Sequence, residues 1–352
     1  MDWNRNGGTN SMTFKTPTIT AIIIACDGYN TLCKTVKSVI DVVDEVIILN
    51  TGTLEWVKTV PIQSEKKINI VTYKWENDFS KARNIAINHA SKDICFFIDA
   101  DEYLITESQK NFRRVMNEVF SHDEKSLYAP LIDNLNGIIL RNNVRIFKKR
   151  GTLKYKGAVH EYLNSNDSKI VHLPDIILEH SGYLDEEMNG IKKTRNLSLL
   201  RKELSVDPYN LRWNFFLLRY IDKDSPERMK IMRIFSKIKL PYPPESEVYC
   251  FNVKTQIIIY LLESGKFEKA FNQATELYQF YKDKNSARLY FISHYLNSKH
   301  LFHSSLNTLN ELKSKIDELS DDIYLNNKIS NYEFNHVIND FNKDYKFITK
   351  QS

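Results

Sequence analysis

The chain has 352 residues, of which 42% are apolar and 26% are charged. At roughly 100–200 residues per domain this length predicts about two domains, and the composition excludes collagen-like, mucin-like and wholly disordered proteins. The formal charge of +5 at pH 7 favours an anionic partner of nucleotide size and is too small to indicate a nucleic-acid-binding protein.

Four cysteines occur without the C-x-x-C spacing that indicates a zinc site or a redox motif. They are Cys26, Cys33, Cys95 and Cys250. Their scatter does not indicate a disulfide framework either, which is typical of a reducing compartment. The first residues lack the apolar core of a signal peptide, and no run of about 18 apolar residues follows. We therefore expect a cytoplasmic protein without a membrane span, with residues 1–17 as a flexible polar tail.

Short apolar runs alternate with amphipathic segments over the first hundred residues. The runs predict buried strands at Ile19–Cys26, Glu45–Leu49, Ile68–Tyr73 and Ile94–Ile98. Between them, apolar residues at helical spacing predict a helix over Thr31–Val42, and Asp78 can cap a second helix that begins at Phe79. This alternation predicts a Rossmann-like α/β domain with a mostly parallel sheet and a ligand at the carboxyl ends of the strands.

The pattern changes after residue 126. Shorter alternating pieces over Leu127–His180 predict a mixed, partly antiparallel region. Beyond Asp207 the chain is almost entirely helical, and Tyr260, Leu261, Phe267 and Leu277 recur as Tyr295, Leu296, Phe302 and Leu312, at an offset of 35 residues. This period predicts helical hairpins of the tetratricopeptide (TPR) type, with a generic helical bundle as the alternative. We expect an α/β domain over residues 18–206 and a TPR-like domain over residues 207–352.

The strongest chemical signal is a pair of carboxylates directly after the apolar run ICFFI. Asp99 and Asp101 stand at i and i+2, where an extended chain points both side chains to one side. Such a pair can hold a hard divalent cation, which neutralises the diphosphate leaving a nucleotide-activated donor. A solvated turn is the alternative for an isolated D-x-D, and the buried strand before it favours the metal site.

Five motifs in order resemble bacterial family 2 glycosyltransferases of the GT-A fold, many of which carry TPRs behind the catalytic domain. The motifs are Trp75–Asn84 (WENDFSKARN), Phe97–Glu102 (FIDADE), Arg145–Phe147 (RIF), Tyr155–Glu161 (YKGAVHE), and His180–Tyr183 (HSGY) followed by Lys193–Asn196 (KTRN). Within that family the chain most resembles the sublancin-type peptide S-glycosyltransferases of glycocin biosynthesis. These transfer a sugar from a UDP donor to a cysteine, or sometimes a serine, of a bacteriocin precursor.

The resemblance implies a donor site and a metal site. Asp99 would face the ribose or sugar, and Asp101 would bind Mg²⁺ or Mn²⁺ on the diphosphate, with Asp99 and His180 completing the metal set. Imidazole suits Mn²⁺ better than Mg²⁺; the alternative for His180 is a hydrogen-bonded histidine beside a turn. The further donor-binding candidates are Ala25, Asp27, Asn50, Arg83 and Ala100.

Three of these donor-site candidates have an alternative role or depart from the family pattern. Arg83 would reach the nucleotide or orient Asp99, or else form a plain salt bridge. Asn50 stands where relatives have an Asp-rich segment, so its amide would contact the uracil edge differently from a carboxylate. Asp27 lies in Cys26-Asp27, which replaces the usual Asn-Glu pair.

An inverting transfer needs a base that takes the proton of the acceptor. Glu161 is the candidate, followed by His160 and Glu102, and an ion pair is the alternative role for Glu161. A thiol with a free pKa near 8.5 already supplies some thiolate, so a cysteine acceptor depends less on this base than a hydroxyl does.

The predicted function is therefore the metal-dependent, inverting transfer of a hexose, taken as glucose, from a UDP-sugar to a peptide. One alternative is the synthesis of cell-surface polysaccharide or lipid-linked glycan, and another is a non-catalytic TPR interaction protein. The helical domain would supply homodimer contacts or hold the acceptor peptide. Lys148-Lys149-Arg150 is interpreted as a solvated turn, so no nucleic-acid partner is expected.

Overall fold

A computed structural model describes residues 16–26, 29–53, 66–122, 125–135, 137–165, 168–180, 186–301, 306–316 and 331–349. Asp27 and residues 1–15 of the predicted tail lie outside these ranges. The chain divides into two compact units. The boundary between them in the sequence lies between Leu199 and Leu200, inside helix α5 (Glu186–Val206). Each unit is described below by itself.

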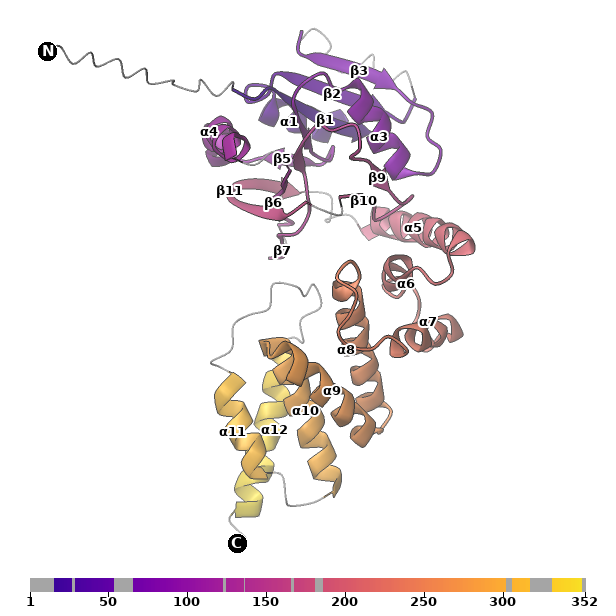
Figure 1. The fold of residues 1–352 in the computed structure, drawn as a ribbon, viewed down its shortest axis with the longest axis vertical. Helices are drawn as coiled ribbons and strands as arrows, with labels where there is room; N and C mark the ends of the chain where they lie inside the picture. Colours follow the sequence, from indigo (N-terminus) through magenta and orange to yellow (C-terminus); the bar gives the residue numbers. More distant parts are fainter. Residues whose placement is uncertain are drawn as a thin grey trace, which may run out of the picture. The chain divides into compact units, whose positions relative to one another are not determined.

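The first unit is built on one sheet whose first half is parallel (Figure 1). Strands β1 (Ile19–Ala25), β2 (Glu45–Asn50), β3 (Ile68–Thr72) and β4 (Ile94–Phe97) lie in the order β3-β2-β1-β4. Every neighbouring pair among them is parallel. Each strand ends within one residue of its predicted end. Strands β1, β2 and β4 are largely buried apolar runs, whereas β3, at the edge of the sheet, is partly exposed.

The second half of the sheet is mixed and continues β4-β8-β6-β11-β5. These strands are β5 (Glu102–Leu104), β6 (Leu127–Asp133), β8 (Ile146–Lys148) and β11 (Ile170–His180), with β7 (Ile139–Leu140) paired to β6. Strand β8 is antiparallel to both neighbours, whereas β6 and β11 are parallel. The prediction of a mostly parallel sheet thus holds for its first half, and the sheet as a whole is mixed. A separate ribbon pairs β9 (Tyr155–Lys156) with β10 (Tyr162–Leu163).

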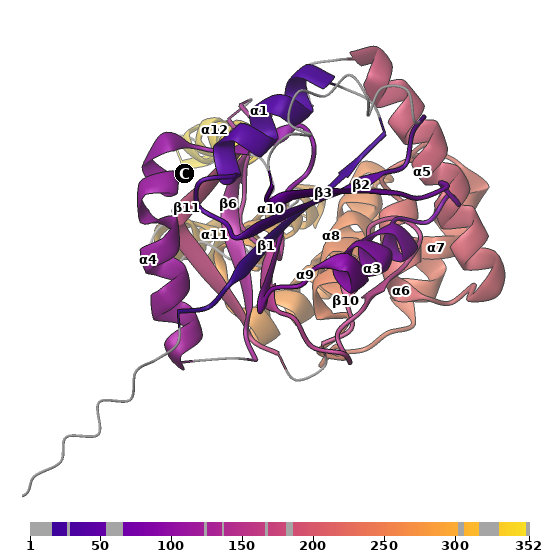
Figure 2. The ribbon, with the colours of Figure 1, turned by 90° about the horizontal axis from the view of Figure 1, so that it is seen from above.

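Helices cover both faces of this sheet, as Figure 2 shows from above. Helices α1 (Tyr29–Val39) and α4 (Thr106–His122) pack on one face, and α3 (Phe79–His89) packs on the other. Side chains of strand β1 pack on both faces of the sheet. Ala21 and Ile23 belong to the core under α1 and α4, and Ile22 belongs to the core under α3. This is the alternation that a central strand requires.

Two helices illustrate what local sequence predicts. The N-cap of α3 is Asp78, whose carboxylate accepts a hydrogen bond from the backbone N–H of Lys81 at 2.9 Å, which confirms the predicted cap. Helix α4 is absent from the predicted elements, although its buried Phe112, Val115 and Met116 have the helical spacing that would have indicated it.

The second unit is entirely helical in its described part. Its helices are α6 (Leu211–Leu217), α7 (Pro226–Ser236), α8 (Glu247–Glu263), α9 (Phe267–Tyr281), α10 (Lys284–Leu301), α11 (Leu306–Ile316) and α12 (Asn331–Thr349). Consecutive helices pack together from α8 to α11. The offset of 35 residues carries α8 onto α10 and α9 onto α11, and the equivalent leucines Leu277 and Leu312 are both buried. The unit is therefore a TPR-like helical repeat.

None of the helices within the described ranges is long and apolar enough to span a bilayer. All four cysteines are free thiols, and Cys95 and Cys250 are buried.

Candidate functional site

The candidate site begins at the tight turn that follows β4. The backbone N–H of Glu102 donates to the carbonyl of Asp99 at 2.9 Å, and the Asp99 N–H donates back to the Glu102 carboxylate at 3.0 Å. Because β4 is buried along its whole length, this turn is held at the carboxyl edge of the sheet. The structure thereby places Asp99, Ala100 and Asp101 where a ligand of an open α/β sheet binds.

Helix α1 braces the turn from one side. The hydroxyl of Thr35 lies 3.0 Å from the Ala100 carbonyl oxygen and 2.6 Å from that of Glu102. The Ser38 hydroxyl accepts a hydrogen bond from the Leu104 N–H at 3.0 Å. Both side chains are buried, so these bonds are shielded from water and fix the backbone around Asp101.

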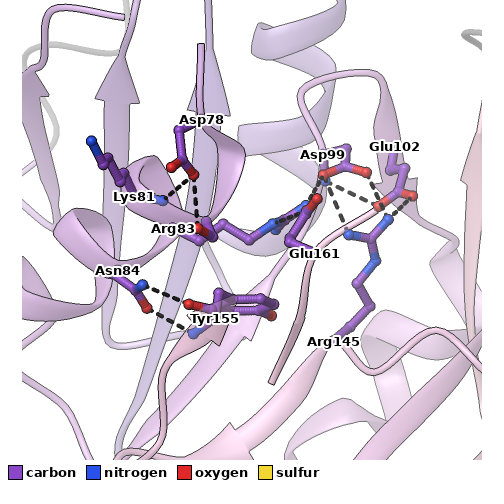
Figure 3. A network of polar contacts seen from close by, with 10 residues as sticks. Asp78, Lys81, Arg83, Asn84, Asp99, Glu102, Arg145, Tyr155 and Glu161 are labelled. Carbon is purple, nitrogen blue, oxygen red and sulfur yellow. Dashed lines mark hydrogen bonds and ion pairs between the residues drawn. The ribbon is translucent and has the colours of Figure 1, made fainter. Parts of the chain in front are cut away.

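Two arginines reach Asp99 from different elements (Figure 3). Arg145, just before β8, places one guanidinium nitrogen 2.7 Å from Asp99 Oδ2 and 2.5 Å from Glu102 Oε1. Arg83 of α3 lies 3.3 Å from Asp99 Oδ1, and its Nε lies 2.5 Å from Glu161 Oε1. Arg83 thus forms ion pairs with both Asp99 and Glu161, whereas a contact with the nucleotide remains a prediction.

These contacts set the protonation of the cluster. Burial by itself would raise the pKa of Asp99, but the charges of Arg145 and Arg83 outweigh it and hold this pKa below its ordinary range. Burial raises the pKa of Glu102, with Arg145 opposing. Asp99 thus stays ionised at neutral pH, and 40% of its side chain is exposed.

Asp101 points to a different partner. Its Oδ2 lies 3.3 Å from Nε2 of His180, the last residue of β11, and the other ring nitrogen, Nδ1, lies 3.0 Å from Oδ1 of Asn134. Burial would lower the pKa of His180, but the hydrogen bond and charge of Asp101 raise it. A carboxylate from the turn after β4 and an imidazole from the end of β11 therefore converge on one point.

The donor chemistry of this pair fits a divalent cation. Carboxylate oxygen and imidazole nitrogen are both ligands of Mn²⁺, and the cluster contains more carboxylates than guanidinium groups. Within the described ranges, no three His, Cys, Asp or Glu side chains are grouped as a complete metal site. Asp99 is engaged with the two arginines, so it does not join Asp101 and His180 as the predicted set of three required, and oxygens of a bound diphosphate would have to complete the coordination.

The other predicted donor contacts lie in two neighbouring loops. Asn50 is fully buried, and its side chain braces its own loop: Oδ1 accepts from the Gly52 N–H at 2.9 Å and Nδ2 donates to the Thr53 carbonyl at 3.2 Å. The Ala25 carbonyl accepts from the Thr51 N–H at 2.8 Å. Both residues thus shape the end of the first strands through loop contacts.

The three candidate bases differ in how they are held. Glu102 is 1% exposed and committed to Arg145, which leaves no path to an acceptor. Glu161 forms the ion pair that the sequence analysis gave as its alternative role. His160 is half-buried with a φ of 50°, a left-handed conformation unusual outside glycine.

Sequence reasoning missed three residues of this site. Arg145 stood in a quoted motif without a role, Thr35 was only part of an amphipathic helix, and Asn134 had no role. A buried arginine in a strand needs carboxylate partners, which was the available signal for Arg145. Thr35 and Asn134 act through contacts with residues far away in sequence, so no local pattern could have indicated them.

Comparison with known proteins agrees with this geometry. The family model described as glycosyl transferase family 2 matches residues 20–118. The chain is 33% identical over 217 residues to the SPbeta prophage-derived glycosyltransferase SunS of Bacillus subtilis. The aligned segment covers 59% of this chain and 51% of SunS. It is also 27% identical over 176 residues to a TPR repeat-containing protein of Synechococcus elongatus, covering 47% and 42% of the two chains.

Among solved structures, that of residues 1–349 of S. aureus TarS aligns with a TM-score of 0.39 and 11% identity, covering 86% of this chain and 91% of that one. The chain spans about half the length of the curated relatives that it matches. The resemblance predicted from the motifs is confirmed: residues 20–118 match the family 2 glycosyl transferase model, and residues of the first unit and beyond are similar to SunS.

Proposed function

We propose that the protein is a metal-dependent, inverting glycosyltransferase that moves a hexose, taken as glucose, from a UDP-sugar to a cysteine or serine of a bacteriocin precursor peptide. The observation that carries the proposal is the turn after β4. It directs Asp99, locked by two arginines, and Asp101, paired with His180, to the carboxyl edge of the sheet. A buried charge network of this kind is a costly feature that a plain scaffold does not need.

The residues divide the work of such a transfer. Asp99 would hydrogen-bond the ribose or sugar of the donor, in an orientation set by Arg83 and Arg145. Asp101 and His180 would hold Mn²⁺ or Mg²⁺, which neutralises the diphosphate as it leaves. The acceptor sulfur or oxygen would form a bond to the anomeric carbon while the bond between that carbon and the diphosphate oxygen breaks. The acceptor proton passes to a base, for which Glu161 and His160 remain the candidates.

Similarity to SunS, described as a glycosyltransferase, at 33% identity supports the transfer of a sugar. The peptide acceptor rests on the resemblance of the sequence motifs to sublancin-type peptide S-glycosyltransferases. Free thiols in the chain agree with catalysis in a reducing cytoplasm, where an acceptor cysteine would also stay reduced. We further propose that the TPR-like unit holds the acceptor peptide, either in one chain or as a homodimer.

Release of UDP from UDP-glucose in the presence of Mn²⁺ tests the proposal. Asp101→Ala should lower turnover at least about tenfold through loss of a metal ligand, whereas Asp175→Ala, an exposed aspartate of β11, should leave it unchanged. Mass spectrometry of a candidate precursor peptide should show one added hexose on cysteine. No turnover of any nucleotide sugar would overturn the enzyme proposal, and a sugar found only on lipid would overturn the peptide acceptor.

A further inference from the structure

We propose that Asn134 is a positioning residue that fixes the ring of His180 with its Nε2 directed at Asp101, so that these two side chains form a preorganised cation site. The inference rests on the proposed function and concerns a residue outside the family motifs. In the proposed mechanism Asn134 does not touch the donor.

The geometry comes from sheet register. Strands β6 and β11 are parallel neighbours, and Asp133 of β6 lies opposite Glu179 of β11. Asn134 directly follows β6, and His180 is the last residue of β11, so the register of the sheet brings the two side chains together. Their polar atoms, Asn134 Oδ1 and His180 Nδ1, lie 3.0 Å apart.

This contact determines which ring nitrogen carries the proton in the neutral imidazole. An amide oxygen can only accept, so Nδ1 must donate, and the lone pair of neutral His180 is left on Nε2. That lone pair faces Asp101 Oδ2 at 3.3 Å. In the metal-free protein a proton on Nε2 can donate to the Asp101 carboxylate, and a cation bound by both atoms can take the place of that proton. The arrangement is therefore suited to a cation that both atoms bind.

Asn134 is itself rigidly held. It is 3% exposed, and its backbone N–H donates to the Ile138 carbonyl at 3.2 Å across the turn between β6 and β7. The Asp133 carboxylate accepts from the Leu135 N–H at 2.9 Å, and Leu135 adopts a left-handed φ of 59°. Because its own backbone holds Asn134 in place, the contact that it makes with His180 costs little entropy when a metal binds.

The test measures Mn²⁺ binding directly, through the electron paramagnetic resonance signal of free Mn²⁺, on the full chain with UDP present. Asn134→Leu keeps the approximate volume and removes the acceptor, and it should weaken Mn²⁺ binding about 10–100-fold. Asn134→Asp restores an acceptor and should stay within about threefold of the unchanged protein. Asn111→Leu on α4 is the matched control and should change nothing.

A double-mutant cycle separates positioning from general damage. Once His180→Ala has removed the ring, Asn134→Leu should cause no further loss of Mn²⁺ affinity, because it acts through that ring. Equal Mn²⁺ binding by Asn134→Leu and the unchanged protein, or an equal loss in Asn134→Leu and Asn134→Asp, would overturn the inference. If the unchanged protein bound neither Mn²⁺ nor UDP, the proposed function would fail instead.

Discussion

Arg145 is the residue that joins the buried carboxylates of the site. It contacts both Asp99 and Glu102, and its own side chain is only 9% exposed. Burial would lower the pKa of Arg145, but Asp99 and Glu102 outweigh it and raise this pKa, so the guanidinium stays charged. Removing one partner from such a network leaves an uncompensated charge inside the protein, which costs more than the pair contributes when intact.

This predicts a large stability effect for Arg145→Met. The free energy of unfolding of the first unit should fall by about 3–5 kcal/mol, measured by urea denaturation followed by circular dichroism. Arg114→Met, which removes an exposed ion pair with Glu118, should change it by less than about 0.5 kcal/mol. Equal effects of the two substitutions would show that the buried network is not what stabilises this region.

Glu161 has two possible roles, base or ion-pair partner, which kinetic measurements can distinguish. As the base, Glu161→Gln should lower kcat more for a serine acceptor than for a cysteine acceptor, since a thiol is partly ionised already. If Glu161 is only an ion-pair partner of Arg83, Glu161→Gln should lower kcat equally for both acceptors and should also lower the free energy of unfolding. We expect equal effects, because the 2.5 Å contact engages the carboxylate, and a selective loss for serine would contradict this.

At the scale of elements, the carboxylate of Asp44 ties the start of β1 to α4. Its oxygens accept from the Ile19 N–H at 2.8 Å and from the Arg113 guanidinium at 2.9 Å. Burial raises the pKa of Asp44, but the hydrogen bonds from Arg113 and Ile19 outweigh it, so the net effect is a lowered pKa. The ionised carboxylate therefore stabilises the packing of these two elements.

The sign of the pH dependence follows from this lowered pKa. A group with a depressed folded-state pKa stabilises the fold above its unfolded pKa of about 3.9, and this contribution is lost as pH falls through the folded pKa. Asp44→Asn should thus lower the free energy of unfolding at pH 6 by up to about 1 kcal/mol, with the difference shrinking toward pH 3. Asp41→Asn, an exposed neighbour, is the control. A difference that stayed constant with pH would rule out the ionic explanation.

For the whole molecule, the division into two compact units predicts that damage to one leaves the other folded. Leu277 is fully buried between the repeat helices, so Leu277→Ala should lower the stability of the second unit by about 2–5 kcal/mol. Binding of UDP, measured by calorimetry, should be unchanged because the candidate donor site lies wholly in the first unit. Ile259→Ala, at a partly exposed position of α8, should cost less. Loss of UDP binding in Leu277→Ala would contradict the independence of the units.

Several features were accessible from local sequence. Strands β1, β2 and β4 were predicted because a strand buried on both faces is a continuous apolar run. Asp78 was recognisable as a cap from its place before a helix. The repeat was visible because equivalent leucines fill equivalent positions. Asp99 and Asp101 stood out because they follow the buried strand β4 directly.

Other features depend on the tertiary structure, because they join residues far apart in sequence. Strand register sets His180 beside Asn134, and the packing of α1 sets Thr35 against the turn that carries Asp101. Arg145 and Arg83 form ion pairs with Asp99, whereas Asp101 pairs with His180, and neither partner could be assigned from the sequence. Local sequence thus determined which elements form and which carboxylates reach the sheet edge, whereas only three-dimensional packing decided the partner of each charge, since pairing depends on distance in space.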